Sequence, residues 1–197
     1  MSQLMDLVAS QLDAGTLGKL SGSLGVDQGQ VEQVVSGAMP LLVNALARNA
    51  SDDRGASQLA GALDRDHDGS VLDNLAGFLG NTSNGDSGVL RHVLGNRQST
   101  VEQGLSRMSG LEPSQVSQVL SLLGPVVLGA VSKLRQDRNL DAGGLQQLLG
   151  RESEAVQQRD PESMGILGRL IDQDGDGDVS DDIVNIGSKL LGNFLRS

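Results

Sequence analysis

Residues 25–46, GVDQGQVEQVVSGAMPLLVNAL, align without gaps on residues 110–131, GLEPSQVSQVLSLLGPVVLGAV, 85 positions further along the chain. Apolar residues in both stretches recur three and four positions apart, as they do along one face of an α-helix. Each stretch has a proline at the same place, Pro40 and Pro125. An interior proline removes a backbone donor and clashes with the preceding turn. The alignment therefore predicts two equivalent helices, each interrupted or kinked at its proline.

The self-similarity continues beyond these helices at a larger offset. Residues 63–71, LDRDHDGSV, match residues 171–179, IDQDGDGDV, and an amphipathic segment ending in Leu-Gly-Asn follows both. No segment alternates convincingly as a strand. We therefore predict an all-α fold of two duplicated units of short helices, each with one EF-hand-like acidic loop. The units are residues 1–96 with loop 64–75, and residues 97–197 with loop 172–183.

The composition favours many short helices and excludes some functions. The chain has 27 glycines, 4 prolines, 2 phenylalanines and no tryptophan or tyrosine, so Leu, Val, Ile, Ala and Met must fill the core. Glycine supplies left-handed helix caps and close helix contacts. The net charge is −10 and the 15 lysines and arginines are scattered. Because phosphate binding needs clustered cations, we expect no nucleic-acid surface.

The sequence gives little sign of export or membrane insertion. The first residues, MSQLMDLV, lack the basic and continuous apolar regions of a signal peptide, so a cytoplasmic location is expected. Residues 119–131 are uncharged but include Gly124 and Pro125. A membrane-spanning helix needs about 20 apolar residues, so this stretch is expected to be a buried helix and no membrane span is predicted.

The two acidic loops carry the first half of an EF-hand calcium loop. Aspartates occupy the first, third and fifth positions of each loop, and a glycine, Gly69 or Gly177, occupies the sixth. Ca²⁺ takes six to eight oxygen ligands, and the glycine permits the sharp turn that aims the next backbone carbonyl at the ion. The predicted ligands are Asp64, Asp66, Asp68, Ser70 and Asp73 in the first loop, and Asp172, Asp174, Asp176, Asp178 and Asp181 in the second.

Both loops then depart from the EF-hand pattern. The twelfth position, normally a bidentate glutamate, is Leu75 or Ile183. Asp73 and Asp181, at the tenth position, are the candidate replacements. Without such a replacement, the affinity should fall toward the weak end of the EF-hand range, with a dissociation constant of about 10⁻⁴ to 10⁻³ M. Calcium at two sites is preferred over magnesium, which favours octahedral sites that retain water.

A simpler interpretation is that the aspartates cap the following helix. Aspartate is a good N-cap and is stabilised at the positive end of the helix dipole. One aspartate suffices for a cap, however, and capping does not explain the alternating spacing followed by glycine. The acidic loops therefore favour metal binding.

Other chemistries have little support. The two histidines, His67 and His92, are far apart and the chain has no cysteine, so there is neither a typical zinc set nor a disulfide. No nucleophile-elbow serine motif and no P-loop are present. The chain is therefore expected not to be an enzyme.

The pattern LGxxxxQVxxVVxxxxPxLxxAL followed by DxDxDGSVLDNLAGFLGN resembles the YidB-like bacterial family, filed as domain of unknown function 937. The resemblance is best at residues 25–81 and 110–195. It implies an all-helical fold and brings no established activity. Members usually carry one such unit, so a second unit is a departure.

Three functional hypotheses remain open. The first is a structural or interaction module that the cation stabilises, with an unidentified protein partner or self-association. The second is a calcium sensor or buffer, which would have to open an apolar groove. The sparse Met and Phe content disfavours such a groove. The third is a metal-dependent hydrolase, which would need an open coordination position beside a base.

Overall fold

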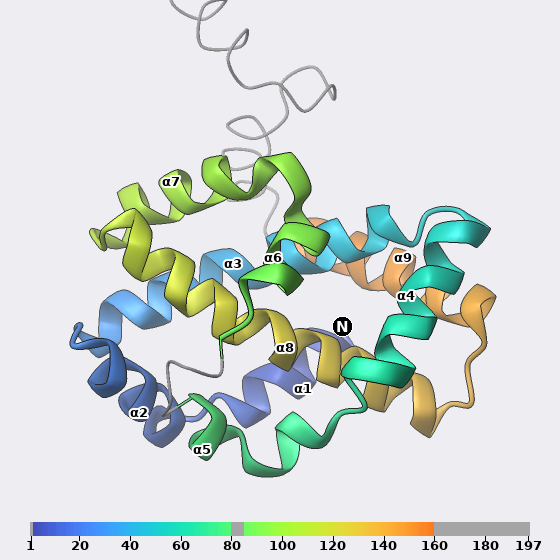
Figure 1. Cartoon of the computed structure of the whole chain (residues 1–197), viewed down its shortest axis with the longest axis horizontal. Helices are drawn as coiled ribbons and strands as arrows, with labels where there is room; N and C mark the ends of the chain where they lie inside the picture. The colour runs from blue at the N-terminus through green and yellow to red at the C-terminus, as the bar shows by residue number, and fades with distance from the viewer. Residues whose placement is uncertain (1, 80–84, 160–197) are drawn as a thin grey trace, which may run out of the picture.

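The computed structural model describes residues 2–79 and 85–159, and every regular element in these ranges is helical (Figure 1). This confirms the predicted all-α class. In chain order the elements are α1 (Gln3–Gln11), α2 (Ala14–Leu24), α3 (Gln28–Asn49), α4 (Asp53–Asp66), the 3₁₀ helix η1 (Ser70–Asn74), α5 (Leu75–Leu79), α6 (Ser87–Leu94), the 3₁₀ helix η3 (Gly95–Arg97), α7 (Gln98–Ser109), α8 (Pro113–Asp137) and α9 (Ala142–Arg159).

The long helix α8 runs through the middle of the fold (Figure 1). Every residue from Val119 to Ser132 is buried, so the predicted buried helix at 119–131 is confirmed. Helix α3 packs against α8 and also contacts α7 and α9. Leucine, valine and alanine dominate the buried cluster around these helices. Apolar burial on this scale is the main favourable contribution to folding.

One hydrophobic cluster contains buried residues from both of the predicted units. Helix α1 contacts α8, and α6 contacts α3, so the packing crosses the predicted boundary between residues 96 and 97. That boundary falls inside η3. In the described part of the chain, the two sets of helices therefore share one core.

The predicted interruption at the prolines was wrong, because α3 and α8 each continue through their proline. Pro125 has no backbone N–H to donate to the carbonyl of Ser121 one turn earlier. The N–H of Asp86, which lies just before α6, donates to that carbonyl at 3.1 Å. A tertiary hydrogen bond thus satisfies an acceptor that the helix itself leaves open.

Capping residues fix where the two long helices begin. Asp27 precedes α3, and its side chain accepts a hydrogen bond from the N–H of Gly29 at 2.8 Å. Glu112 precedes α8, and its N–H donates to the Gln115 side chain at 3.0 Å. Pro113 is the first residue of α8, where a missing N–H costs nothing. Both long helices therefore begin inside the two aligned stretches.

A buried carboxylate joins the two ends of the described chain. Glu152 of α9 is 5% exposed. It accepts hydrogen bonds from the backbone N–H groups of Gln3 at 3.0 Å and Leu4 at 3.1 Å, and from the Ser2 hydroxyl. The first N–H groups of a helix have no partner within the helix. Glu152 therefore caps α1 from 148 to 150 residues away.

Candidate functional site

The first acidic loop joins α4 to η1. Asp64 and Asp66 lie in the last turn of α4, which ends at Asp66. Gly69 has φ 95° and ψ −7°, a left-handed conformation that glycine adopts at little cost. The EF-hand pattern places its sharp turn at this glycine. The chain thus turns at Gly69 just before η1, whereas the first and third loop positions are helical, so the EF-hand-like loop stays a prediction.

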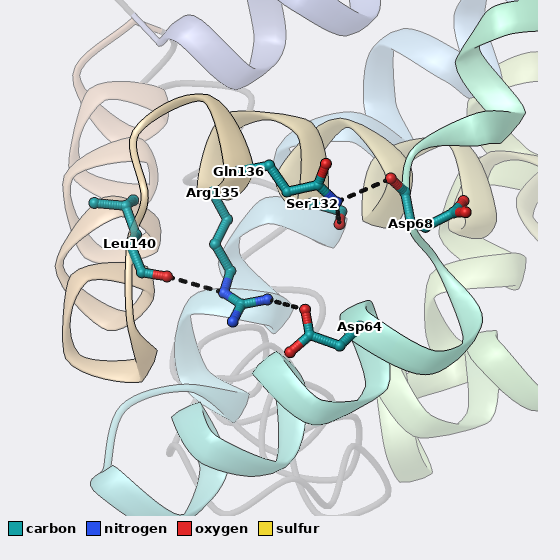
Figure 2. A network of polar contacts seen from close by, with 6 residues as sticks. All are labelled: Asp64, Asp68, Ser132, Arg135, Gln136 and Leu140. Atoms are coloured by element: carbon teal, nitrogen blue, oxygen red, sulfur yellow. Dashed lines mark hydrogen bonds and ion pairs between the residues drawn. The ribbon is translucent and has the colours of Figure 1, made fainter.

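Polar contacts hold the loop on the C-terminal end of α8 (Figure 2). The Arg135 guanidinium forms an ion pair with the Asp64 carboxylate. Its Nε donates to the carbonyl of Leu140 at 3.1 Å. The Gln136 amide donates to the carbonyl of Asp68 at 3.1 Å and to the Ser132 hydroxyl at 3.2 Å. The loop is thus tied to α8 by one side-chain pair and one side-chain-to-backbone bond.

Two glycines let the loop approach α8 closely. A Cβ built on Gly129 of α8 would lie 2.6 Å from Cγ1 of Val71 and 3.5 Å from Cα of Gly69. A Cβ on Gly69 would lie 3.3 Å from the carbonyl oxygen of Gly129. Larger residues at these positions would therefore force the loop away from α8.

The first-loop ligand candidates are exposed and are not gathered into a metal site. Among the residues that the structure describes, no group of three or more His, Asp or Glu side chains lies close enough together to hold a metal ion. The metal set therefore stays a prediction. The exposed first-loop candidates are Asp64, Asp66, Asp68, Ser70 and Asp73. The second-loop candidates, Asp172, Asp174, Asp176, Asp178 and Asp181, lie outside the described residues.

Hydrogen bonds and burial set the protonation of the loop. The hydrogen bond from Arg135 lowers the pKa of Asp64. Hydrogen bonds from the Ser70 side chain and backbone lower the pKa of Asp68, whose Oδ1 accepts the Ser70 N–H at 2.9 Å. Burial lowers the pKa of the half-buried His67, and the charges of Asp66 and Asp86 oppose this. Two carboxylates of the first loop are thus held ionised, and the Asp68 contact is a local bond to the first residue of η1, whose N-cap is Gly69.

The central helix has the length and composition of a membrane span but the burial of a core helix. Among the described helices, α8 alone is long and apolar enough to cross a membrane. In its most apolar window of 18 residues, 78% of the residues are buried inside the protein. Its apolar surface is therefore already covered by the other helices.

A model of the family described as "Bacterial protein of unknown function (DUF937)" matches residues 6–134, which is more than half of the chain. The chain belongs to this family. The resemblance seen in the sequence is thereby confirmed over residues 6–134, which include the first acidic loop. No curated protein and no solved structure matches the chain.

Nothing in the sequence indicated three α8 residues that hold the first loop, namely Ser132, Arg135 and Gln136. Ser132 and Gln136 carry no motif, and they lie 64 or more residues from the loop aspartates that they support. The family match ends at residue 134, just before Arg135. Only the packing of α4 and η1 on α8 brings these groups to the loop.

We expect Arg135→Gln to raise the pKa of Asp64 toward its usual value of 3.8, because the hydrogen-bonding cation is removed. A carboxyl whose folded-state pKa is lowered contributes stability above its unfolded pKa, and this contribution is lost as the pH falls through the folded value. The variant should therefore lose less stability on acidification. An NMR titration of the Asp64 carboxyl measures the shift. Arg138→Gln, at an exposed position nearby, should leave this pKa unchanged, and an equal response to both changes would contradict the pairing.

Proposed function

We propose that the protein is a non-enzymatic binder of divalent cations, most suitably Ca²⁺, in which the ion stabilises a helical structural or interaction module. The observation that carries the proposal is the recurrence of the Asp-x-Asp-x-Asp-Gly spacing at residues 64–69 and 172–177. Alternating carboxylates followed by a turn glycine are the arrangement by which a short loop wraps a hard cation.

The conformation of Gly69 supports the proposal at the first loop. Its left-handed backbone gives the turn that the calcium-loop pattern requires at that position. Asp64, Asp68 and Asp73 are exposed, so a cation can reach them from solvent. Cation binding requires Asp64 to leave Arg135 and the last turn of α4 to open, since Asp64 and Asp66 are now on the helix. This rearrangement, with the missing twelfth-position glutamate, accounts for the weak affinity that we expect.

We further propose that the module is an internal duplication, in which α1 to α4 correspond to α6 to α9. Helices α2 and α7 both end at a left-handed glycine, Gly25 with φ 67° and Gly110 with φ 73°. A long helix with an internal proline follows each glycine, and an aspartate caps the next helix. The capped pairs are Asp52 with Gly55 at 2.7 Å and Asp141 with Gly144 at 2.8 Å. The recurrence of the same caps in the same order favours two copies of one unit.

Calcium titration tests the binding proposal. We expect isothermal calorimetry to detect two weak sites, and calcium to raise the melting temperature. A ligand that binds only the folded state adds about 2.7 kcal/mol at a hundredfold excess over its dissociation constant. Asp172→Ala with Asp174→Ala should abolish the second-loop site, and Asp64→Ala with Asp66→Ala should abolish the first.

The matched control removes two carboxylates outside the acidic loops. Asp13→Ala with Asp27→Ala changes the net charge by the same amount and should keep both binding events, although it removes two helix caps. If the loop variants and the control keep the same calcium response, the loops are not the sites. If the wild-type protein gives no binding heat and no melting shift, the proposed function is wrong.

A further inference from the structure

One face of α8 is covered by the chain that follows the first acidic loop. Ser121, Pro125, Gly129 and Ser132 are spaced so that they share a helix face, and all four are buried. Gly69 and Val71 pack on Gly129, and the N–H of Asp86 donates to the Ser121 carbonyl. The first acidic loop, η1 and Asp86 therefore cover this face of α8.

The corresponding face of α3 is more open. In the alignment, Ser36, Pro40 and Ala47 stand where α8 has Ser121, Pro125 and Ser132. Ser36 is exposed, and Pro40 and Ala47 are half-buried, whereas their three counterparts are buried. Asn44 stands at the position of Gly129 and contacts Ser153 of α9. Helix α9 thus covers this face of α3 at Asn44, while Ser36, Pro40 and Ala47 are less buried than their counterparts on α8.

An exposed methionine lies beside this face. Met108 of α7 is 44% exposed and is the one exposed large hydrophobic residue among those described. Its sulfur and methyl group lie against Gly37 of α3, where a built Cβ would be 2.5 Å from the methyl carbon. The aligned residue on α2 is Ser23, whose hydroxyl donates to the carbonyl of Leu79 at the end of α5 at 3.4 Å. Helix α2 contacts the end of α5 at Ser23. At the aligned position on α7, the apolar side chain of Met108 is exposed to solvent.

We propose that the C-terminal segment, residues 179–195, docks on this open face of α3 and α7, as η1 and α5 dock on α8 and α2. We call the surface formed by Ser36, Pro40, Ala47 and Met108 the open face. The inference rests on the proposed duplication and is independent of cation binding. Its occupant is a segment of the same chain that lies outside the described residues.

The sequence and the length of the chain after α9 both favour residues 179–195 as the segment that covers the open face. Residues 171–179 match residues 63–71, so the segment has the place in the second unit that η1 and α5 have in the first. Ile183, Ile186, Leu190 and Phe194 recur three and four positions apart, which gives an apolar helix face that needs cover. Residues 160–178 separate the segment from α9. At about 3.3 Å per extended residue they reach roughly 60 Å, enough to return to α7.

Cysteine pairs test the docking, because the natural chain has no cysteine. We expect Met108→Cys combined with Leu190→Cys, or with Ile186→Cys, to form a disulfide within one chain under mild oxidation. The matched control combines Ser23→Cys with Leu190→Cys. Ser23 is exposed on α2, beside the end of α5, and should stay reduced because that site is already occupied. Oxidation is carried out in chelator, so that docking is measured without any cation.

A tryptophan reporter gives a second readout, because the natural chain has no tryptophan. Phe194→Trp should emit at shorter wavelength than free tryptophan, and adding Met108→Lys should shift the emission to longer wavelength. Gln103→Lys, an equal charge change on the exposed side of α7, should not. Disulfides no faster than in the Ser23 control, or disulfides only between chains, would overturn the proposal. Intact docking without calcium binding would instead reject the proposed function alone.

Discussion

Leu105→Ala and Leu20→Ala should each lower the free energy of unfolding by about 2–5 kcal/mol, the usual cost of removing a buried leucine side chain and leaving a cavity. Leu105 lies on α7 and Leu20 at the aligned position on α2, and both side chains are 0% exposed. Both belong to the buried cluster that the described helices share, so each change should lower the stability of all of these helices. Urea unfolding followed by circular dichroism measures it.

Exposed residues on the same helices provide the control. Gln103→Ala and Lys19→Ala should change stability by less than about 0.5 kcal/mol, since neither side chain is buried. If α2 and α7 are equivalent parts of a duplicated unit, the two leucine variants should lose similar stability. A loss below about 1 kcal/mol for either leucine would contradict its place in the core.

Helix type and position were predictable because the signal is local. The three-and-four spacing of apolar residues predicts helices at 25–46 and 110–131, and the structure has α3 and α8 there. Capping depends on residues only a few positions apart, so Asp27 and Glu112 could be recognised as helix starts. The sequence did not predict that α8 continues through Pro125, and the donor to the Ser121 carbonyl, the N–H of Asp86, is a contact that exists only in the folded chain.

The candidate site was predictable only where backbone geometry dominates. The turn at Gly69 follows from its place after three alternating aspartates, and its φ of 95° agrees. The arrangement of the carboxylates does not follow from their spacing in the sequence, because Asp64 and Asp66 belong to the last turn of helix α4. The Arg135 partner of Asp64 lies 71 residues away, with no motif to indicate it. Sequence spacing therefore gives the ligand types but not the side-chain arrangement.

The contact between Glu152 and residues 2–4 could not be predicted from the sequence either. A lone glutamate at position 152 in a polar stretch would ordinarily be assigned to a solvent-exposed face. It is buried because α9 places its carboxylate at the N-terminus of α1, where unpaired N–H groups and the positive end of the helix dipole favour a negative charge. This contact connects the first helix to the last one described.

Glu152→Ala should lower the free energy of unfolding by about 2–6 kcal/mol, because leaving a buried donor without a partner costs about 1–3 kcal/mol and two of the donors to Glu152, on Ser2 and Leu4, are buried. The donors affected are the N–H groups of Gln3 and Leu4 and the hydroxyl of Ser2. Glu152→Gln keeps one side-chain acceptor and removes the charge, so its loss should be intermediate. Thermal and urea unfolding measure both, and amide hydrogen exchange should rise first in α1.

The matched control is Glu154→Ala, which removes an equal charge from an exposed position two residues further along α9. It should change stability by less than about 0.5 kcal/mol and leave exchange in α1 unchanged. If Glu152→Ala and Glu154→Ala have equal effects, the stabilisation comes from net charge and not from capping. If Glu152→Ala instead destabilises the protein while α1 keeps its exchange protection, the carboxylate supports α9 and not the start of α1. Selective loss of protection in α1 is therefore the result that establishes Glu152 as its cap.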